Sequence, residues 1–149
     1  MLDIRLGLPQ PIFELSEEER ERRARVANDA AVLDGERYFV RAVVELPIPE
    51  LDDRFAYGTW VEVAEDDYRR LGELWYDPAQ AEAPPFRGRI ANELEPYVHT
   101  VGLPVELRLH SVDQLPAARL ADSDHPLVRD QRAGISRERS DELAAVVLH

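Results

Sequence analysis

Two strand-like runs and a helix follow one another without a linker over residues 35–75, and this order constrains the fold more than any other part of the chain. Along 37–48, apolar side chains recur at every second position, with Arg41 and Glu45 at intervening ones. Such alternation is typical of a strand with one buried face. The run 55–63 alternates in the same way, so we expect the two strands to pair antiparallel.

A helix is predicted directly after the second strand. Large side chains recur there at the spacing of a buried helical face: Tyr68, Leu71, Leu74 and Trp75. Two aspartates, Asp66 and Asp67, lie in the predicted first turn, where negative charge suits the helix dipole. The helix should end before Pro78, because the residue that precedes a proline disfavours helical backbone.

Shorter elements flank this unit on both sides. Strand-like runs lie at about 87–92, 105–111 and 115–120, and helix signals lie at 16–27, at about 126–132 and from 136 onward. Prolines in residues 1–15 argue against helix there, so we expect an extended N-terminal arm. We predict a single α+β domain over 1–149, with a mostly antiparallel sheet of about four to five strands and helices packed on one face. Residues 125–149 should form a C-terminal helical segment.

Carboxylates outnumber basic side chains in this chain. Thirty aspartates and glutamates against eighteen arginines give a formal net charge of -12, with an isoelectric point of about 4.7. Nucleic acids and anionic membranes attract proteins whose basic side chains neutralise phosphates. We therefore expect neither nucleic acid nor membrane as a partner, and a cation, a basic protein surface or a small molecule remains open.

Metal and redox chemistry find little support in the composition. Cysteine is absent, which excludes disulfides and thiolate metal sites. The four histidines are scattered, and none has the spacing that zinc motifs need. We expect no metal and no cofactor. Residues 1–5 mix acid and base where a signal peptide would be apolar, and no run reaches the length of a membrane span, so we expect a cytoplasmic protein.

Several short motifs occur in an order and spacing that resemble one known family. They are Gly7-Leu8-Pro9, Asp29, Gly35, Phe39-Val40-Arg41, Tyr57-Gly58-Thr59-Trp60-Val61, Gly88-Arg89-Ile90-Ala91-Asn92, His125-Pro126-Leu127 and Gln131-Arg132-Ala133-Gly134-Ile135. Together they resemble the uncharacterised bacterial family catalogued as domain of unknown function 2199, over nearly the whole chain. The resemblance implies membership, and that family has no established activity to carry over.

The chain departs from that family at its beginning. Many members begin with a paired-cysteine motif and a histidine just before the Gly-Leu-Pro step, which resembles half of a metal site. Here the equivalent residues, 1–6, contain neither cysteine nor histidine. The resemblance therefore carries no metal role to this chain.

The richest cluster of chemically capable residues is Asp122, Asp124 and His125, with Arg129 one helical turn further on. Two carboxylates and an imidazole could hold a divalent cation or supply acid and base groups. The same residues also fit the start of a helix, because Pro126 favours a polar residue before it and aspartates suit the exposed N–H groups. The helix start accounts for more of the pattern, and both interpretations remain open.

Aromatic side chains suggest a second candidate site. The set is Tyr57, Trp60, Trp75, Tyr76 and Tyr97, with Arg41, Arg87 or Arg89 placed to grip an anion. Aromatic residues at strand and helix spacing are more often core, and Trp60 falls on the strand face opposite Tyr57. The sequence alone therefore favours core positions for these aromatic residues over a binding pocket.

Charge and missing chemistry together favour a non-enzymatic, immunity-like or adaptor-like module that binds another protein. The alternative is a small-molecule or cation binder, or a hydrolase, that uses Asp122, Asp124 and His125 beside the aromatic residues. A third possibility is a homodimer formed through a sheet edge at 87–92.

Overall fold

Two long strands form the centre of the molecule. The computed structural model describes residues 2–147, and in it β4 (Arg37–Ile48) and β5 (Asp53–Val63) pair antiparallel along their whole length, with Val44 opposite Tyr57. The turn η1 (Pro49–Leu51) joins them. This confirms the predicted hairpin, whose alternating pattern is long enough to fix both its type and its register.

Three shorter strands close this hairpin into a barrel. They are β6 (Phe86–Ile90), β7 (Pro104–Arg108) and β8 (Ala117–Leu120). The order β5-β6-β7-β8 is antiparallel throughout, and β8 returns to β4 in parallel at Val43 and Ala117. The α+β class is confirmed, but the predicted simple sheet is wrong, since its ends meet. β6 pairs with β7 over residues 86–89 and with β5 at Arg89 and Ile90, and the possible homodimer through this strand stays a prediction.

A side chain completes the seam between β8 and β4. Beyond Ala117, β8 has no further strand partner on this side. Gln131 takes that place: its Oε1 accepts from the Leu120 amide at 2.8 Å, and its Nε2 donates to the Ala118 carbonyl at 3.0 Å. The side-chain amide thus satisfies the backbone groups that a longer strand would have bonded.

Further strands extend the sheet beyond the barrel. They are β1 (Leu2–Arg5), parallel to β5, β3 (Ala30–Leu33), antiparallel to β4, and β2 (Ala24–Val26), antiparallel to β3. The helix predicted over 16–27 is α2 (Glu17–Arg23), which is capped as expected by Ser16 Oγ at 3.2 Å from the Glu19 amide and ends where β2 begins.

The N-terminal arm is less extended than predicted. It contains β1 and one short helix, α1 (Gln10–Phe13). Pro9 is the residue before the first turn and Pro11 lies within that turn. An N–H there would have no partner inside the helix, so proline costs little. The prolines therefore mark where this helix begins.

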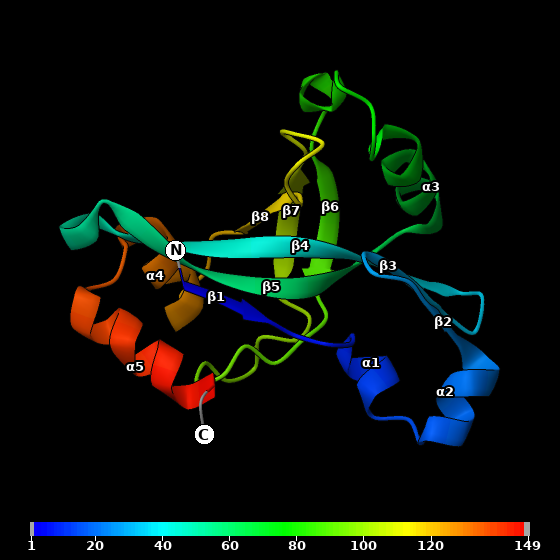
Figure 1. Cartoon of the computed structure of the whole chain (residues 1–149), viewed down its shortest axis with the longest axis horizontal. Coiled ribbons are helices and arrows are strands. Elements are labelled where there is room, and N and C mark those ends of the chain that lie inside the picture. Colours follow the sequence, from blue (N-terminus) through cyan, green and yellow to red (C-terminus); the bar gives the residue numbers. More distant parts are fainter. Residues whose placement is uncertain (1, 148–149) are drawn as a thin grey trace.

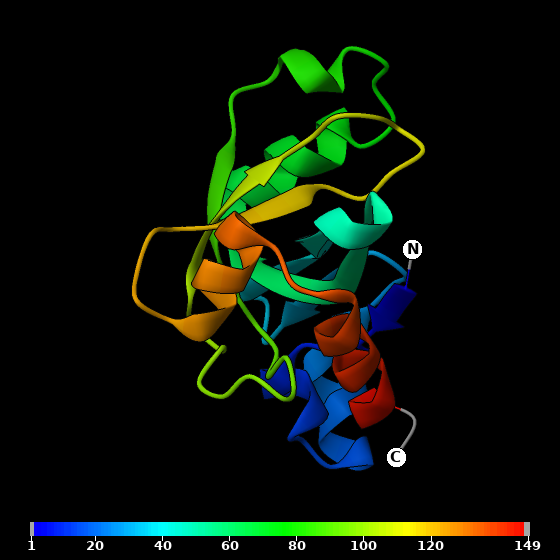
Figure 2. The ribbon, with the colours of Figure 1, turned by 90° about the vertical axis from the view of Figure 1, so that its left-hand side faces the viewer.

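The remaining helices lie at the ends of the barrel. They are α3 (Glu65–Leu74), α4 (Pro126–Ala133) and α5 (Arg137–Val147), and a turn η2 (Gln80–Glu82) follows α3. Figure 1 shows α3 at one end and α4 and α5 at the other, and Figure 2 shows α4 in orange in front of the barrel strands, with α5 in red below them. All three helices nevertheless bury their apolar residues in the core inside the barrel, so they cover the inner face of the sheet. Leu148 and His149 of the predicted 125–149 segment lie outside the described residues.

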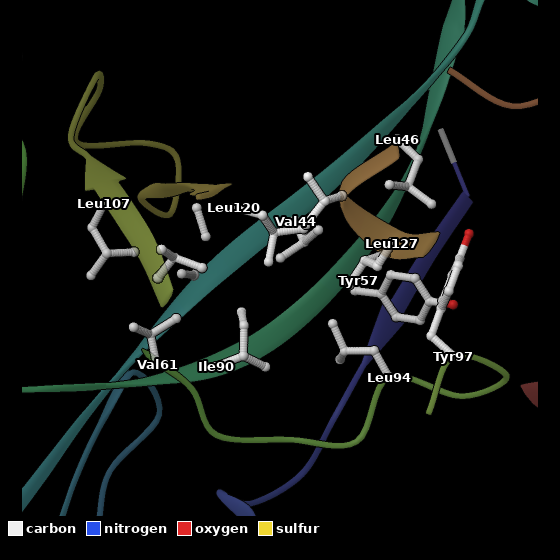
Figure 3. Packing of buried hydrophobic residues seen from close by; sticks show 14 of the residues in the cluster. Val44, Leu46, Tyr57, Val61, Ile90, Leu94, Tyr97, Leu107, Leu120 and Leu127 are labelled. Atoms are coloured by element: carbon white, nitrogen blue, oxygen red, sulfur yellow. The ribbon is translucent and has the colours of Figure 1, made fainter. Parts of the chain in front are cut away.

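Apolar side chains form two cores on opposite sides of the β4–β5 hairpin. The larger core fills the barrel, with Tyr57 and Tyr97 facing each other among aliphatic side chains from every barrel strand (Figure 3). The smaller core lies outside the barrel, where Phe39 and Trp60 pack against Ile12 of α1. Alternate residues of β4 and β5 enter these two cores, whereas the period-two pattern predicted only one buried face.

No helix among residues 2–147 combines the length and the apolar character that crossing a membrane requires.

Candidate binding groove

Two adjoining hollows lie along the C-terminal end of α3. Their volumes are about 780 and 410 Å³. The walls are α3, the turn between β2 and β3, the loop 109–116 and the arm around Arg5 and Gly7. Figure 1 shows α3 and the β2–β3 hairpin on the same side of the barrel. Both hollows share the same central residues: Ala27, Asn28, Asp29, Trp75 and Tyr76. We call the two together the α3 groove.

Aromatic side chains line the α3 groove because of the way α3 ends. Leu71 and Leu74 are buried in the barrel core, which leaves the following two residues to face outward. Trp75 is half-buried, whereas Tyr76 is 83% exposed. Tyr and Trp at such positions offer a large contact area for a small loss of side-chain entropy.

Buried Gln80 fixes the end of α3. Its Nε2 donates to the carbonyls of Leu74 and Trp75, at 2.9 and 3.0 Å. These are among the carbonyls that a helix C-terminus leaves unpaired. Gln80 therefore holds the backbone of Leu74 and Trp75 at the end of the helix, directly before the exposed Tyr76.

Arg41 lies at the base of the groove and is almost fully buried. Its guanidinium donates to the carbonyls of Leu6 at 2.6 Å and Asn28 at 2.8 Å, and it stacks over the Trp60 ring at 4.5 Å. No carboxylate of a described residue forms a salt bridge with it. Burial lowers the pKa of Arg41, since removal from water disfavours its charge. Arg41 thus ties the arm and the β2–β3 turn to the barrel wall.

Asn92 holds the same region from the other side of Trp60. Its Oδ1 accepts from the Trp60 amide at 2.8 Å and from Thr59 Oγ1 at 3.0 Å, and its Nδ2 donates to the Leu8 carbonyl at 2.7 Å. The indole N–H of Trp60 is buried and has no described partner. Trp60 therefore acts through packing, and the arm is anchored beside the groove.

Charge is unevenly spread around the α3 groove. Four charged residues line it, two of each sign: Arg5, Arg41, Asp29 and Asp113. On α3 itself both arginines are paired, Arg69 with Glu65 at 3.3 Å and Arg70 with Glu73 at 2.9 Å. Asp66 and Asp67 add two further carboxylates to the same helix. The helix that forms the wall is therefore net negative.

The predicted aromatic pocket is divided among three places. Tyr57 and Tyr97 lie in the barrel core, with ring centroids 6.4 Å apart, and Trp60 lies in the outer core. Only Trp75 and Tyr76 come together with Arg41 in the α3 groove. Arg87 and Arg89 line a separate hollow on the other strands of the barrel. Period-two spacing shows which residues share a face of a strand, but it does not show which faces other segments of the chain cover.

The cluster at 122–129 forms the start of α4. His125 caps the helix: its Nδ1 accepts from the Leu127 amide at 3.0 Å, and its Nε2 lies 2.8 Å from the Val98 carbonyl, which identifies Nε2 as the protonated nitrogen. Asp122 accepts from Arg132 at 3.1 Å. Asp124 and Arg129 are exposed. Among the described residues no three potential ligands converge as a metal site requires, and ligand binding by this cluster stays a prediction.

Sequence reasoning missed the β2–β3 hairpin and with it half of the groove. The signal was present: the Asn28-Asp29 step lies between short runs that contain β-branched or small apolar residues. Asn and Asp favour turns because their side chains bond nearby backbone. Gln80 carried no such signal, since its role depends on where η2 folds back onto α3.

The barrel, its helical ends and the groove define a mixed α+β barrel protein with an aromatic-lined surface groove. The chain belongs to a bacterial family, described as an uncharacterized protein conserved in bacteria (DUF2199), whose model matches residues 1–135. This confirms the resemblance found from the short motifs. No curated protein and no solved structure matches the chain.

The motif residues of the resemblance gather in two structural networks. Gly7, Arg41, Trp60 and Asn92 belong to the network that anchors the arm. The second network joins α4 to the barrel: His125 caps α4, Gln131 completes the seam, and the Gly134 amide donates to the Asp130 carbonyl as α4 ends. In this structure both sets of motif residues hold the fold together, while Trp75 and Tyr76 lie outside them.

Proposed function

We propose that this protein is a cytoplasmic, non-enzymatic binding module, of an immunity or adaptor type, that takes a basic segment of another protein into the α3 groove. The observation that carries this proposal is Tyr76, which is 83% exposed next to Trp75 at the end of α3 that Gln80 holds. Large exposed aromatic residues of this kind are enriched where binding energy concentrates in interfaces.

Electrostatics supports a basic partner. The net charge of -12 draws cationic surfaces over long range, and α3, which forms one wall of the groove, carries more carboxylates than arginines. Complementary charge of this kind raises association rates and is screened by salt. The aromatic pair would then supply short-range contact, because Trp and Tyr rings attract guanidinium and ammonium groups.

A phage-displayed peptide library panned against the protein tests this proposal. Selected peptides should be rich in arginine and lysine, and Tyr76→Ala should weaken their binding by about tenfold, the effect of losing one aromatic anchor. Phe13→Ala is the matched control, because Phe13 is an exposed aromatic residue, at 60%, that lies outside the groove. Binding should also weaken as sodium chloride is raised.

Acidic or uncharged selected peptides would contradict the proposal. So would peptides that bind the Tyr76→Ala and Phe13→Ala variants equally well, since that result would place the binding surface elsewhere.

A further inference from the structure

A second hollow lies on the outer face of β6, β7 and β8, which run side by side in Figure 1. Its volume is about 870 Å³. Four arginines line it: Arg87, Arg89, Arg119 and Arg132. We call it the arginine hollow. It is distinct from the α3 groove, with which it shares no lining residue.

Strand geometry directs these side chains outward. On β6, Gly88 and Ile90 face the inside of the barrel, so Arg87 and Arg89 face out. On β8, Ala118 and Leu120 are buried, so Arg119 faces out as well. The ordinary alternation of a strand therefore places three guanidinium groups on one surface.

Arg87 and Arg119 lie in one row across the sheet. Arg87 is opposite Glu106 of β7, and Glu106 is opposite Arg119 of β8. Two inter-strand spacings separate the arginines, roughly 10 Å between their backbones. Long flexible side chains bring guanidinium groups at this separation within reach of one small molecule.

These two arginines are available to a ligand. Neither side chain forms a hydrogen bond or an ion pair with another described residue. Glu106 accepts from Arg108 on its own strand at 3.3 Å. At the rim, Arg89 donates to the Gly102 carbonyl at 3.1 Å, and Arg132 pairs with Asp122 at 3.0 Å. The rim arginines are thus held in place while the central pair is free.

We infer that the arginine hollow binds a small anion that carries at least two phosphate or carboxylate groups, bridging Arg87 and Arg119. Guanidinium groups match the paired oxygens of both acids, and the hollow falls within the size range of small-molecule sites. A nucleic acid strand fits less well, because its many phosphates would meet the negative charge of the rest of the protein.

Thermal unfolding and titration calorimetry with tripolyphosphate and with citrate test this inference. A ligand of the native state raises the midpoint of unfolding, so at least one of the two anions should do so. The anion with the larger effect identifies the preferred group. Arg87→Gln and Arg119→Gln should each weaken its binding by about tenfold, since each removes charge-assisted hydrogen bonds.

Two further variants separate this site from general charge effects. Arg22→Gln removes the same charge from an exposed arginine on α2, outside the hollow, and should leave binding unchanged. Glu106→Gln removes the carboxylate between the two arginines and should tighten binding by several fold.

Failure of both anions to shift unfolding would overturn the inference, as would equal losses in Arg22→Gln and Arg87→Gln. Circular dichroism of each variant checks that it is folded. The outcome is independent of the peptide experiment, because none of these substitutions lies in the α3 groove.

Discussion

Arg41 stacks over the Trp60 ring with its guanidinium carbon 4.5 Å from the ring centroid, and its nitrogens donate to carbonyls of two other segments. The segments are the N-terminal arm and the turn that precedes β3. Neither of them is adjacent to Arg41 in the sequence. A cation with fixed, planar donors can join three pieces of backbone in this way, whereas a point charge cannot.

Arg41→Lys should therefore lower the free energy of unfolding by about 2–3 kcal/mol, because lysine keeps the charge but loses the fork of donors and the stacking. Guanidinium chloride unfolding followed by tryptophan fluorescence measures this. Arg54→Lys is the control: Arg54 forms an exposed pair with Glu45, so the cost there should stay below about 1 kcal/mol. Equal costs would show that Arg41 acts only through its charge.

Gln131→Leu should destabilise the barrel at its seam. Leucine is similar in size but cannot bond the Leu120 amide or the Ala118 carbonyl. The cost should be about 1–3 kcal/mol for each backbone group left without a partner. Hydrogen exchange of the Leu120 amide should become faster, while Gln10→Leu, at a side chain 3.5 Å from its nearest partner, should change little. Unchanged exchange at Leu120 would contradict the role given to Gln131.

Two glycines should respond to alanine in opposite directions. At Gly88 an added Cβ would lie 2.5 Å from Val61 Cγ1 and 2.8 Å from the Glu62 carbonyl oxygen, so Gly88→Ala should cost about 1–3 kcal/mol. At Gly72, inside α3, nothing lies within 4 Å, and Gly72→Ala should stabilise by about 0.5–1 kcal/mol. Thermal unfolding of both variants tests this prediction. If the unfolding midpoint rises in both variants or falls in both, the contrast drawn between the crowded Gly88 and the open Gly72 is contradicted.

Stability should fall at alkaline pH because of two tyrosines in the barrel core. Burial raises the pKa of Tyr57 and of Tyr97, and a hydrogen bond to Asp130 raises the pKa of Tyr97 further. An unfolded chain loses these protons near a pH of about 10, whereas the folded chain keeps them to higher pH. The stabilisation that the two tyrosines give to the folded state is thus complete below about pH 10, and it is lost as the pH rises above that value.

Chemical unfolding at several values between about pH 9 and pH 11 measures this dependence. Tyr97→Phe should make the decline shallower, because one of the two protons no longer contributes. An identical slope in the wild type and the variant would show that Tyr97 does not keep its proton in the folded state.

Local signals predicted the longest elements well. The alternation of 37–48 and the helical spacing after Asp66 identify β4, β5 and α3, because each pattern extends over many residues. The closed barrel was not predictable in this way. Closure depends on β8 reaching Val43, a contact of one residue pair that leaves no periodic trace in the sequence.

The candidate site was predicted only in part. Trp75 and Arg41 were chosen from residue type, and the structure brings them into one groove. Tyr57 and Trp60 were chosen for the same reason, yet they lie in separate cores. Residue type shows what a side chain can do, whereas burial depends on which segment covers it, and for Trp60 that segment is the distant N-terminal arm.

The seam held by Gln131 sets the order in which this molecule can assemble during synthesis. The five barrel strands are complete by Leu120, but α4, which supplies Gln131 and the buried Leu127 and Val128, follows them in the chain. A nascent polypeptide that ends at β8 therefore has an open cylinder with apolar residues facing water. Residues of α5 complete this core as well, since Leu143 is buried in it, so termination between Leu120 and Leu143 would produce an aggregation-prone chain.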